Sequence, residues 1–171
     1  MKFMSRSRGF SMIELLVAVL VMGIGVLGIT GLQLLSLQNN RGALLRGEAV
    51  QLAYDIMDRI RANPGANYDG LDLADAPPAT ADCNANICTE AQMVTFDQAV
   101  WKCSLGNFNA NAGCVALRAA GVLPPVQDQP GLPSGDGALE VDGATGVVTV
   151  TVQWQEPNLP DLTSIVIESQ G

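Results

Sequence analysis

The sequence predicts an α+β fold: one long N-terminal helix packed on a C-terminal antiparallel sheet of about three or four strands, with a short extra helix and two disulfides. Three observations predict it. Apolar residues recur at helical spacing from about residue 10 to residue 62. Apolar and polar residues alternate near the C-terminus, as in β-strands, and four cysteines lie between positions 83 and 114. At 171 residues the chain is long enough for one domain with a real core.

The first part of the long helix is predicted to cross a membrane. The run from Leu15 to Leu37 has 23 residues without a charge, and a helix needs about 20 residues to cross the hydrocarbon layer. Residues 1–9 carry three basic residues and no acid. The positive-inside rule therefore keeps this end in the cytoplasm and sends the later residues outward.

Two simpler interpretations of this segment, a cleaved secretory signal and a permanent signal anchor, explain it less well. A secretory signal has an apolar core of about 7 to 15 residues, whereas this run is longer and lacks an Ala-x-Ala exit site. A plain anchor gains nothing from Glu14, because a charge inside a membrane helix costs roughly 2.5 to 3.5 kcal/mol. Glu14 therefore needs an explanation of its own.

Four glycines, Gly23, Gly25, Gly28 and Gly31, interrupt the apolar run. Each costs about 1 kcal/mol in helix propensity relative to alanine. The last three follow at intervals of three, which allows a neighbouring helix to approach closely. Glycine is also generally common in membrane helices, so the sequence leaves both interpretations open.

The helical pattern continues beyond the apolar run as an amphipathic segment, residues 41–62. Apolar residues recur there at spacings of three and four: Leu45, Ala49, Leu52, Ile56 and Ile60. The whole helix is expected to run from about residue 10 to residue 62 and to end at the proline at position 64, which disfavours helix at the residue before it. Its 53 residues would span roughly 80 Å.

A short helix is predicted at residues 89–104. Thr89 and Gln92 have the spacing of a capping box, in which the two side chains satisfy free backbone N–H groups at the start of a helix. Met93, Phe96 and Val100 then form its apolar side.

The four cysteines are predicted to form two disulfides in an oxidising compartment. The short helix would separate Cys88 from Cys103 by roughly 22 Å, which is too far for a disulfide. The simplest pairing is then Cys83 with Cys88 and Cys103 with Cys114, because each bond closes a short loop. A four-thiolate zinc site is disfavoured, since the chain has no C-x2-C spacing and the cysteines are expected to be exported.

Three strands are predicted after a proline- and glycine-rich stretch, at residues 138–142, 147–154 and 162–168. They are expected to form an antiparallel meander with one face on the lower half of the long helix. Trp154 is expected to pack in the core rather than to bind a ligand.

Composition excludes several classes of function. From residue 62 to the end, thirteen acidic residues against two basic ones give a net charge of −11, so no nucleic-acid partner is expected. The chain has no histidine, the commonest general acid or base near neutral pH. No enzyme activity or cofactor is predicted, because the sequence shows no catalytic constellation. No metal is predicted, because the acidic cluster Asp69, Asp72 and Asp75 lacks the ligand order of a known calcium loop.

The residues Arg-Gly-Phe-Ser-Met-Ile-Glu-Leu-Leu at positions 8–16 resemble the type III leader of type IV pilins and pseudopilins. The resemblance implies that a prepilin peptidase cuts between Gly9 and Phe10 and methylates the new amino group of Phe10. It also implies that this group pairs with Glu14 of a neighbouring subunit during assembly. One buried charge then compensates another and sets the register. Local melting of the glycine-rich helix within a filament is a further property of this family.

Two later segments are similar to minor pilins of the PilV type: residues 47–65, with Leu-Ala and then Asp-Arg-x-Arg-Ala-Asn, and residues 83–101, from Cys83 to Trp101. The resemblance implies a minor pilin that joins other minor pilins and the major pilin, initiates pilus assembly near the tip, and in some cases presents a tip adhesin for adhesion and twitching motility. A minor pseudopilin of a type II secretion system is the alternative, because it would share the leader. A DNA-uptake competence pilin is disfavoured by the acidic charge.

These predictions divide the chain into four parts. They are a prepilin leader at residues 1–9, a transmembrane half of the helix at 10–40, an amphipathic half at 41–62 and a periplasmic or extracellular domain at 63–171. The precursor is expected in the bacterial inner membrane as a single-pass protein with a cytoplasmic N-terminus, and the processed protein in the extracellular pilus.

Overall fold

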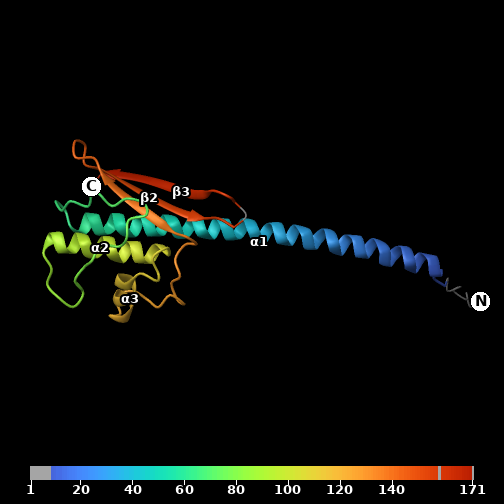
Figure 1. Ribbon diagram of the computed structural model, residues 1–171. Helices are drawn as coiled ribbons and strands as arrows, with labels where there is room; N and C mark the ends of the chain where they lie inside the picture. Colours follow the sequence, from blue (N-terminus) through green and yellow to red (C-terminus); the bar gives the residue numbers. More distant parts are fainter. Residues whose placement is uncertain (1–8, 158, 171) are drawn as a thin grey trace, which may run out of the picture. The chain divides into compact units, whose positions relative to one another are not determined.

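The computed structural model describes residues 9–157 and 159–170. Its elements, in chain order, are α1 (Met12–Ala62), α2 (Glu90–Leu105), α3 (Ala112–Ala119), β1 (Asp136–Val141), β2 (Val147–Gln155) and β3 (Leu162–Gln170) (Figure 1). The predicted α+β fold, with a long N-terminal helix, an antiparallel sheet and two disulfides, is confirmed. The predicted leader, apart from Gly9, lies outside the described residues.

The chain divides into two compact units between Arg41 and Gly42. Residues 12–41 of α1, called the apolar helix below, bury no side chain within the chain. Residues 42–170, called the head, contain the remainder of α1 and every other helix and strand. The division falls beside the predicted change from transmembrane to amphipathic helix.

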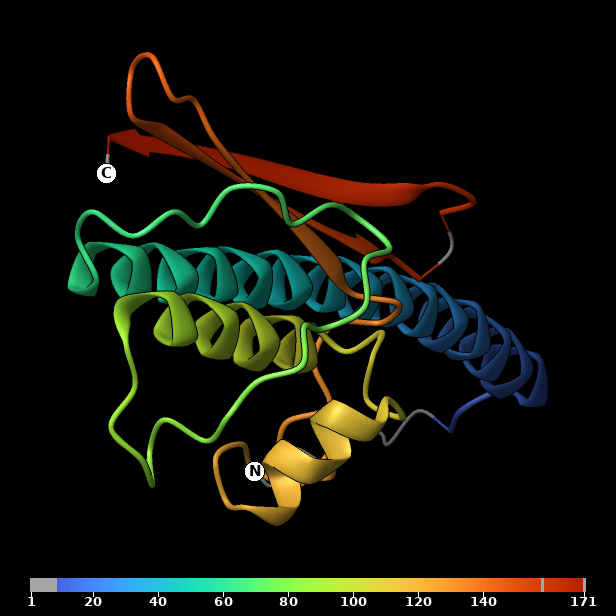
Figure 2. The ribbon, with the colours of Figure 1, turned by 60° about the vertical axis from the view of Figure 1, so that its left-hand side comes forward.

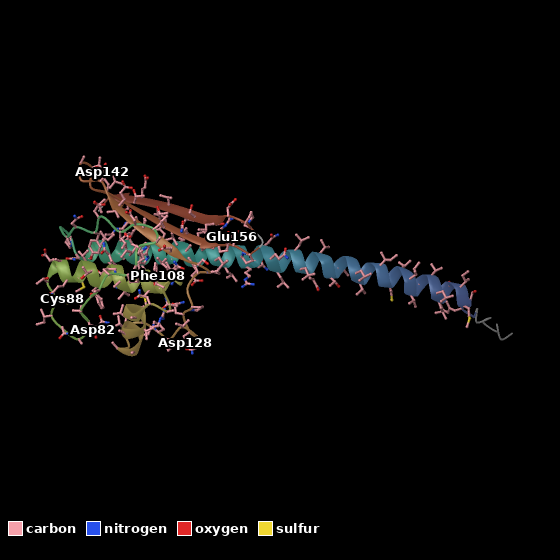
Figure 3. All side chains as sticks on the ribbon, in the orientation of Figure 1. Asp82, Cys88, Phe108, Asp128, Asp142 and Glu156 are labelled. Carbon is pink, nitrogen blue, oxygen red and sulfur yellow. A yellow bond between two sulfur atoms is a disulfide. The ribbon has the colours of Figure 1, made fainter. Side chains whose placement is uncertain are left out.

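The sheet is an antiparallel meander with the order β1-β2-β3. One face of the central strand β2 is buried through alternate residues, as period-2 patterning requires; these residues are Val148, Val150, Val152 and Trp154. Asp142, labelled in Figure 3, closes the turn between β1 and β2. Its side chain accepts hydrogen bonds from the Ala144 N–H and the Thr145 hydroxyl, both at 2.8 Å. These hydrogen bonds lower the pKa of the exposed Asp142 carboxyl.

The head part of α1 lies between the sheet and α2, as Figure 2 shows. Its buried stripe has the spacing that the sequence predicted and consists of Ala49, Leu52, Ala53, Ile56, Met57 and Ile60. The stripe belongs to one core cluster with Trp101 of α2 and the buried face of β2. Burial of apolar surface from three layers holds the head together.

A second, smaller core joins α2 to α3. It contains the Cys103–Cys114 disulfide together with Phe96, Val100 and Leu117. The short helix α3 was not predicted, because its eight residues are too few to show a helical period. Asn111 caps it by accepting a hydrogen bond from the Gly113 N–H at 2.8 Å.

Candidate functional site

The predicted processing site lies just before the start of α1. Gly9 and Phe10 are exposed and precede the helix, which begins at Met12 rather than at the predicted Phe10. The Ser11 carbonyl accepts hydrogen bonds from the backbone N–H groups of Glu14 at 3.1 Å and Leu15 at 3.3 Å. The peptide bond between Gly9 and Phe10 is therefore outside regular secondary structure, and its cleavage stays a prediction.

Glu14 lies in the first turn of α1 and is exposed. A carboxylate is stabilised there by the partial positive charge of the helix N-terminus, by about 0.3 to 1 kcal/mol in water. Glu14 has no ion-pair partner among the described residues. Its position leaves the carboxylate open to a partner outside the chain, and its register role stays a prediction.

The apolar helix is long and hydrophobic enough to cross a membrane, judged by length and composition. An 18-residue window of α1 has a mean hydropathy of 2.6, and none of its residues is buried. Large apolar side chains are exposed all round this part of the helix, from Leu15 to Leu37. Such a surface needs lipid or other apolar helices around it.

No atom of the described chain explains the four glycines of the apolar helix. A Cβ added to Gly23, Gly25, Gly28 or Gly31 would meet nothing within 4 Å, and α1 continues through all four positions. Packing inside this chain therefore does not require them. Close approach of a neighbouring helix, local melting of the helix and the general composition of membrane helices all stay open as explanations for these glycines.

The head presents a different kind of site, a polar network that joins α1, α2 and the loop between them. Arg59 of α1 forms an ion pair with Asp97 of α2 at 3.1 Å. The Tyr68 hydroxyl donates to the other carboxylate oxygen of Asp97 at 2.7 Å and accepts from the Asn63 amide at 3.3 Å. Gln98 of α2 donates to the Tyr68 carbonyl at 3.0 Å.

The environment of this network changes the ionisation of Tyr68 and Arg59. Burial, followed by the hydrogen bond to Asp97, raises the pKa of the Tyr68 hydroxyl well above its ordinary value. Burial alone would lower the pKa of Arg59, but its pairing with Asp55 and Asp97 outweighs burial and raises it. The network is thus held in its neutral tyrosine, charged arginine form.

Trp101 fixes α2 against α1 and against the sheet. Its indole N–H donates to the carbonyl of Leu52 in α1 at 2.9 Å. On the other side the ring lies so close to Gly137 of β1 that a Cβ there would meet Trp101 Cζ2 at 2.9 Å. Only glycine fits at position 137 without movement of the tryptophan.

A buried ion pair connects α2 to the start of β1. The Lys102 ammonium lies 2.7 Å from the Asp136 carboxylate, and both side chains are almost fully buried. Lys102 also donates to the Asp72 carbonyl at 2.8 Å, and Asp136 accepts from the Ala74 N–H at 2.7 Å. The pair is satisfied by hydrogen bonds and holds the loop that contains Asp72 and Ala74.

Sequence reasoning missed both polar sites of the head. Lys102 and Arg118 are the only two basic residues after position 62 in a strongly acidic region. A lone lysine between Trp101 and Cys103 was the one available signal that a cation is buried with a carboxylate. The carboxylate itself lies 34 residues later along the chain, and no local pattern identifies it.

The four cysteines form two disulfides, and Asp72 and Asp75 of the acidic cluster are joined by a hydrogen bond within their own loop. Cys83 is bonded to Cys88 and Cys103 to Cys114, with Cα atoms 5.6 and 5.3 Å apart. In residues 9–157 and 159–170, no group of three or more acidic, cysteine or histidine side chains is placed to hold a metal. Asp75 accepts a hydrogen bond from the Asp72 N–H at 2.9 Å within its own loop.

A surface cavity of about 380 Å³ lies between α3 and the loop at residues 77–82. Its lining is mostly proline, alanine and leucine, and Asp82 is the single ionisable residue in it. The Thr80 hydroxyl in the same lining donates to the Ala81 carbonyl at 3.1 Å rather than to a base, so Asp82 and Thr80 do not form a catalytic constellation.

Comparison with known protein families identifies two regions of the chain. A model of the prokaryotic N-terminal methylation motif matches residues 4–30. A model described as type IV pilin Tt1218 matches residues 31–99. No curated protein and no solved structure matches. The second match covers the part of the head in which Arg59, Tyr68 and Asp97 form their network.

Proposed function

We propose that this chain is a type IV pilin and a minor subunit of a bacterial type IV pilus, made as a precursor that prepilin peptidase cuts between Gly9 and Phe10 and methylates at Phe10. The observation that carries the proposal is an apolar helix that begins within the matched methylation motif and has no partner among the described residues, in a chain whose head contains two disulfides. Such a helix gains its stabilisation only from lipid or from the helices of other subunits.

The proposed route begins in the inner membrane. The apolar helix crosses the bilayer with its basic leader in the cytoplasm and the head in the periplasm. Disulfides are expected there, because the periplasm is oxidising. After cleavage, the processed subunit enters the extracellular pilus.

Glu14 has a proposed role in that step. Its carboxylate lies at the helix N-terminus without a partner among the described residues, and cleavage would create an ammonium group on Phe10 four residues earlier. Pairing of Glu14 with the Phe10 ammonium of a neighbouring subunit compensates a charge that is otherwise costly in hydrocarbon. The pair would then set the axial register of neighbouring helices.

The minor role, in a complex that initiates assembly at the pilus tip, rests on the resemblance of residues 47–65 and 83–101 to PilV-type pilins. The proposed partners are prepilin peptidase, other minor pilins, the major pilin and a tip adhesin. The structure supports a scaffold rather than an enzyme, since the conspicuous polar groups of the head, such as Lys102 and Asp136, are buried and bonded to each other.

A minor pseudopilin of a type II secretion system is the second candidate, because the apolar helix and the methylation motif suit it equally. Deletion of the chain separates the two functions. The pilus proposal expects loss of surface pili and twitching with normal protein secretion. The reverse pattern would identify the secretion machine.

The decisive test of processing is the intact mass of the protein isolated from its own cells. The proposal expects a chain that begins at Phe10, carries one added methyl group and contains two disulfides. Gly9→Leu should leave uncut precursor, whereas Gly47→Leu, in the head part of α1, should be cut normally. Normal cleavage of the Gly9 variant would refute the assignment of the cleavage site.

A further inference from the structure

The two edges of the sheet differ in whether other backbone or side-chain groups cover them. The edge of β1 is covered: the Leu139 N–H donates to the Leu71 carbonyl at 2.8 Å, and the Val141 N–H donates to the Asp69 carboxylate at 3.0 Å. The edge of β3 has no such cover. Within the described residues, β3 pairs only with β2 (Figure 1).

The register identifies which backbone groups of β3 are open. The backbone N–H groups of Leu139 and Val141 point away from β2, so the even-numbered residues of β1 are the ones that exchange hydrogen bonds with β2. Their partners in β2 are odd-numbered, which leaves the even-numbered residues of β2 to bond to β3. These pair with odd-numbered residues of β3, whose backbone N–H and C=O groups therefore point toward β2. The free edge of β3 consists of the N–H and C=O groups that point away from β2, on Leu162, Ser164, Val166, Glu168 and Gln170.

The strand lacks the features that usually protect a free edge. Nine consecutive residues pair with β2 without a bulge, and the strand contains no proline, lysine or arginine. Val166 is 58% exposed on the outer face. On the inner face Ile165 and Ile167 are only partly buried. An added strand would therefore satisfy backbone groups and bury apolar surface together.

We propose that the free edge of β3 is a docking site for an extended, positively charged segment of another protein of the pilus assembly, which pairs with it as a fourth strand. This inference rests on the proposed function. Charge selects the occupant: Glu168 is the only charge on β3, and the exposed Asp161 precedes the strand. Arg61, which donates to the Ser169 hydroxyl of β3 at 2.9 Å, already pairs with Asp58 at 3.0 Å. A second copy of this chain would bring another strongly acidic head against the first.

The first test measures amide hydrogen exchange on β3 in the full-length protein, both in detergent and in isolated pili. Strand addition should slow exchange about five- to tenfold at Ser164, Val166 and Glu168. Exchange at Ile165 and Ile167, whose N–H groups already point toward β2, should change little. This alternation distinguishes an added strand from a protein that merely lies on the sheet. Equal exchange in both samples, with the protein present in pili, would overturn the inference and leave the proposed function intact.

The second test identifies the occupant by zero-length carbodiimide coupling, which joins a carboxylate to a lysine in contact with it. Glu168 should couple to an extended segment of another pilus protein. Glu140, which flanks the same Thr149 from the covered edge, should not couple to that segment. Coupling of Glu168 to a second copy, or no coupling at all, would overturn the assigned occupant.

A pair of variants at one position completes the test. Val166→Pro removes one outward N–H, which an edge strand tolerates, whereas Val166→Thr keeps it. The proline variant should lose the coupling and the threonine variant should keep it. Val166→Lys should lose the coupling too, because its positive charge repels a basic segment. This variant replaces Val166→Pro in the test if the proline variant does not fold. Absence of even the unaltered protein from pili would instead contradict the proposed function.

Discussion

The two parts of α1 form one continuous helix but find their partners in different places. Residues 42–62 bury a stripe against the sheet and α2, whereas residues 12–41 bury nothing within the chain. The difference is one of composition. The head part is apolar on one side only, and the apolar helix is apolar all round. Identical secondary structure therefore serves internal stability in one part and contacts with lipid or other subunits in the other.

Polar groups follow the same division. In the head, Lys102 and Asp136 are buried as a pair, and Asp97 accepts from both Arg59 and Tyr68. Glu14, the single charge between residues 9 and 40, has no partner among the described residues. Substitutions in the head should accordingly change folding, and substitutions in the apolar helix should change assembly.

The largest effect on folding is expected from Asp136→Ala, which leaves the Lys102 ammonium buried without its counter-ion. Breaking one partner of a buried pair costs about 3 to 5 kcal/mol. Denaturant unfolding of the full-length protein in detergent measures this loss. Asp58→Ala breaks only the exposed pair with Arg61 and should cost less than about 1 kcal/mol. Equal losses for the two variants would contradict the importance of burial.

Gly137→Ala should have the next largest effect, because its Cβ would press on the Trp101 ring. Overpacking of this kind costs about 1 to 3 kcal/mol. Gly28→Ala, with nothing within 4 Å of the added atom, should not destabilise the isolated protein. If Gly28 allows a neighbouring helix to approach, that variant should instead enter pili poorly. Normal incorporation of Gly28→Ala would leave the glycine explained by membrane composition alone.

Glu14→Ala should have little effect on folding, at most about 1 kcal/mol from the lost interaction with the helix N-terminus. It should still be cut after Gly9 but enter pili poorly, because the amino group of a neighbouring subunit loses its counter-ion. Immunoblots of sheared pili and membranes measure the ratio. Glu48→Ala, in the head part of the same helix, is the matched control and should be incorporated normally. Normal incorporation of Glu14→Ala would remove the register role.

The smallest effect is a pH dependence at high pH. The folded pKa of Tyr68 is raised above its ordinary value of 10.0. The stabilisation that accompanies the neutral hydroxyl is therefore fully present below pH 10.0 and is lost as the pH rises through the folded pKa. Tyr68→Phe should flatten the decline of unfolding free energy above pH 10.0, and Tyr54→Phe, at a half-exposed position, should not. Parallel declines in all three proteins would contradict this assignment.

Local patterns in the sequence predicted most of the secondary structure. The end of α1 at Ala62 follows from the proline at position 64. The capping box of α2 is present, with the Gln92 N–H donating to the Thr89 hydroxyl at 3.3 Å and the Thr89 N–H donating to the Gln92 side chain at 2.9 Å. All three strands were expected from alternation, and their observed bounds differ from the predicted ones by at most two residues at either end. These features depend on residues close together in the chain, so a local sequence pattern is enough to predict them.

By itself the sequence determined the apolar helix, the methylation motif, the strands and the excess of acidic charge, because each depends on composition or on short spacing. Only the tertiary structure decided that Lys102 faces Asp136 and that Arg59, Tyr68 and Asp97 meet. It also decided that β1 has a covered edge, while β3 has an edge that no other described residue covers. Those relations join residues far apart in the chain. Their energies depend on burial and geometry, which exist only once the layers have packed.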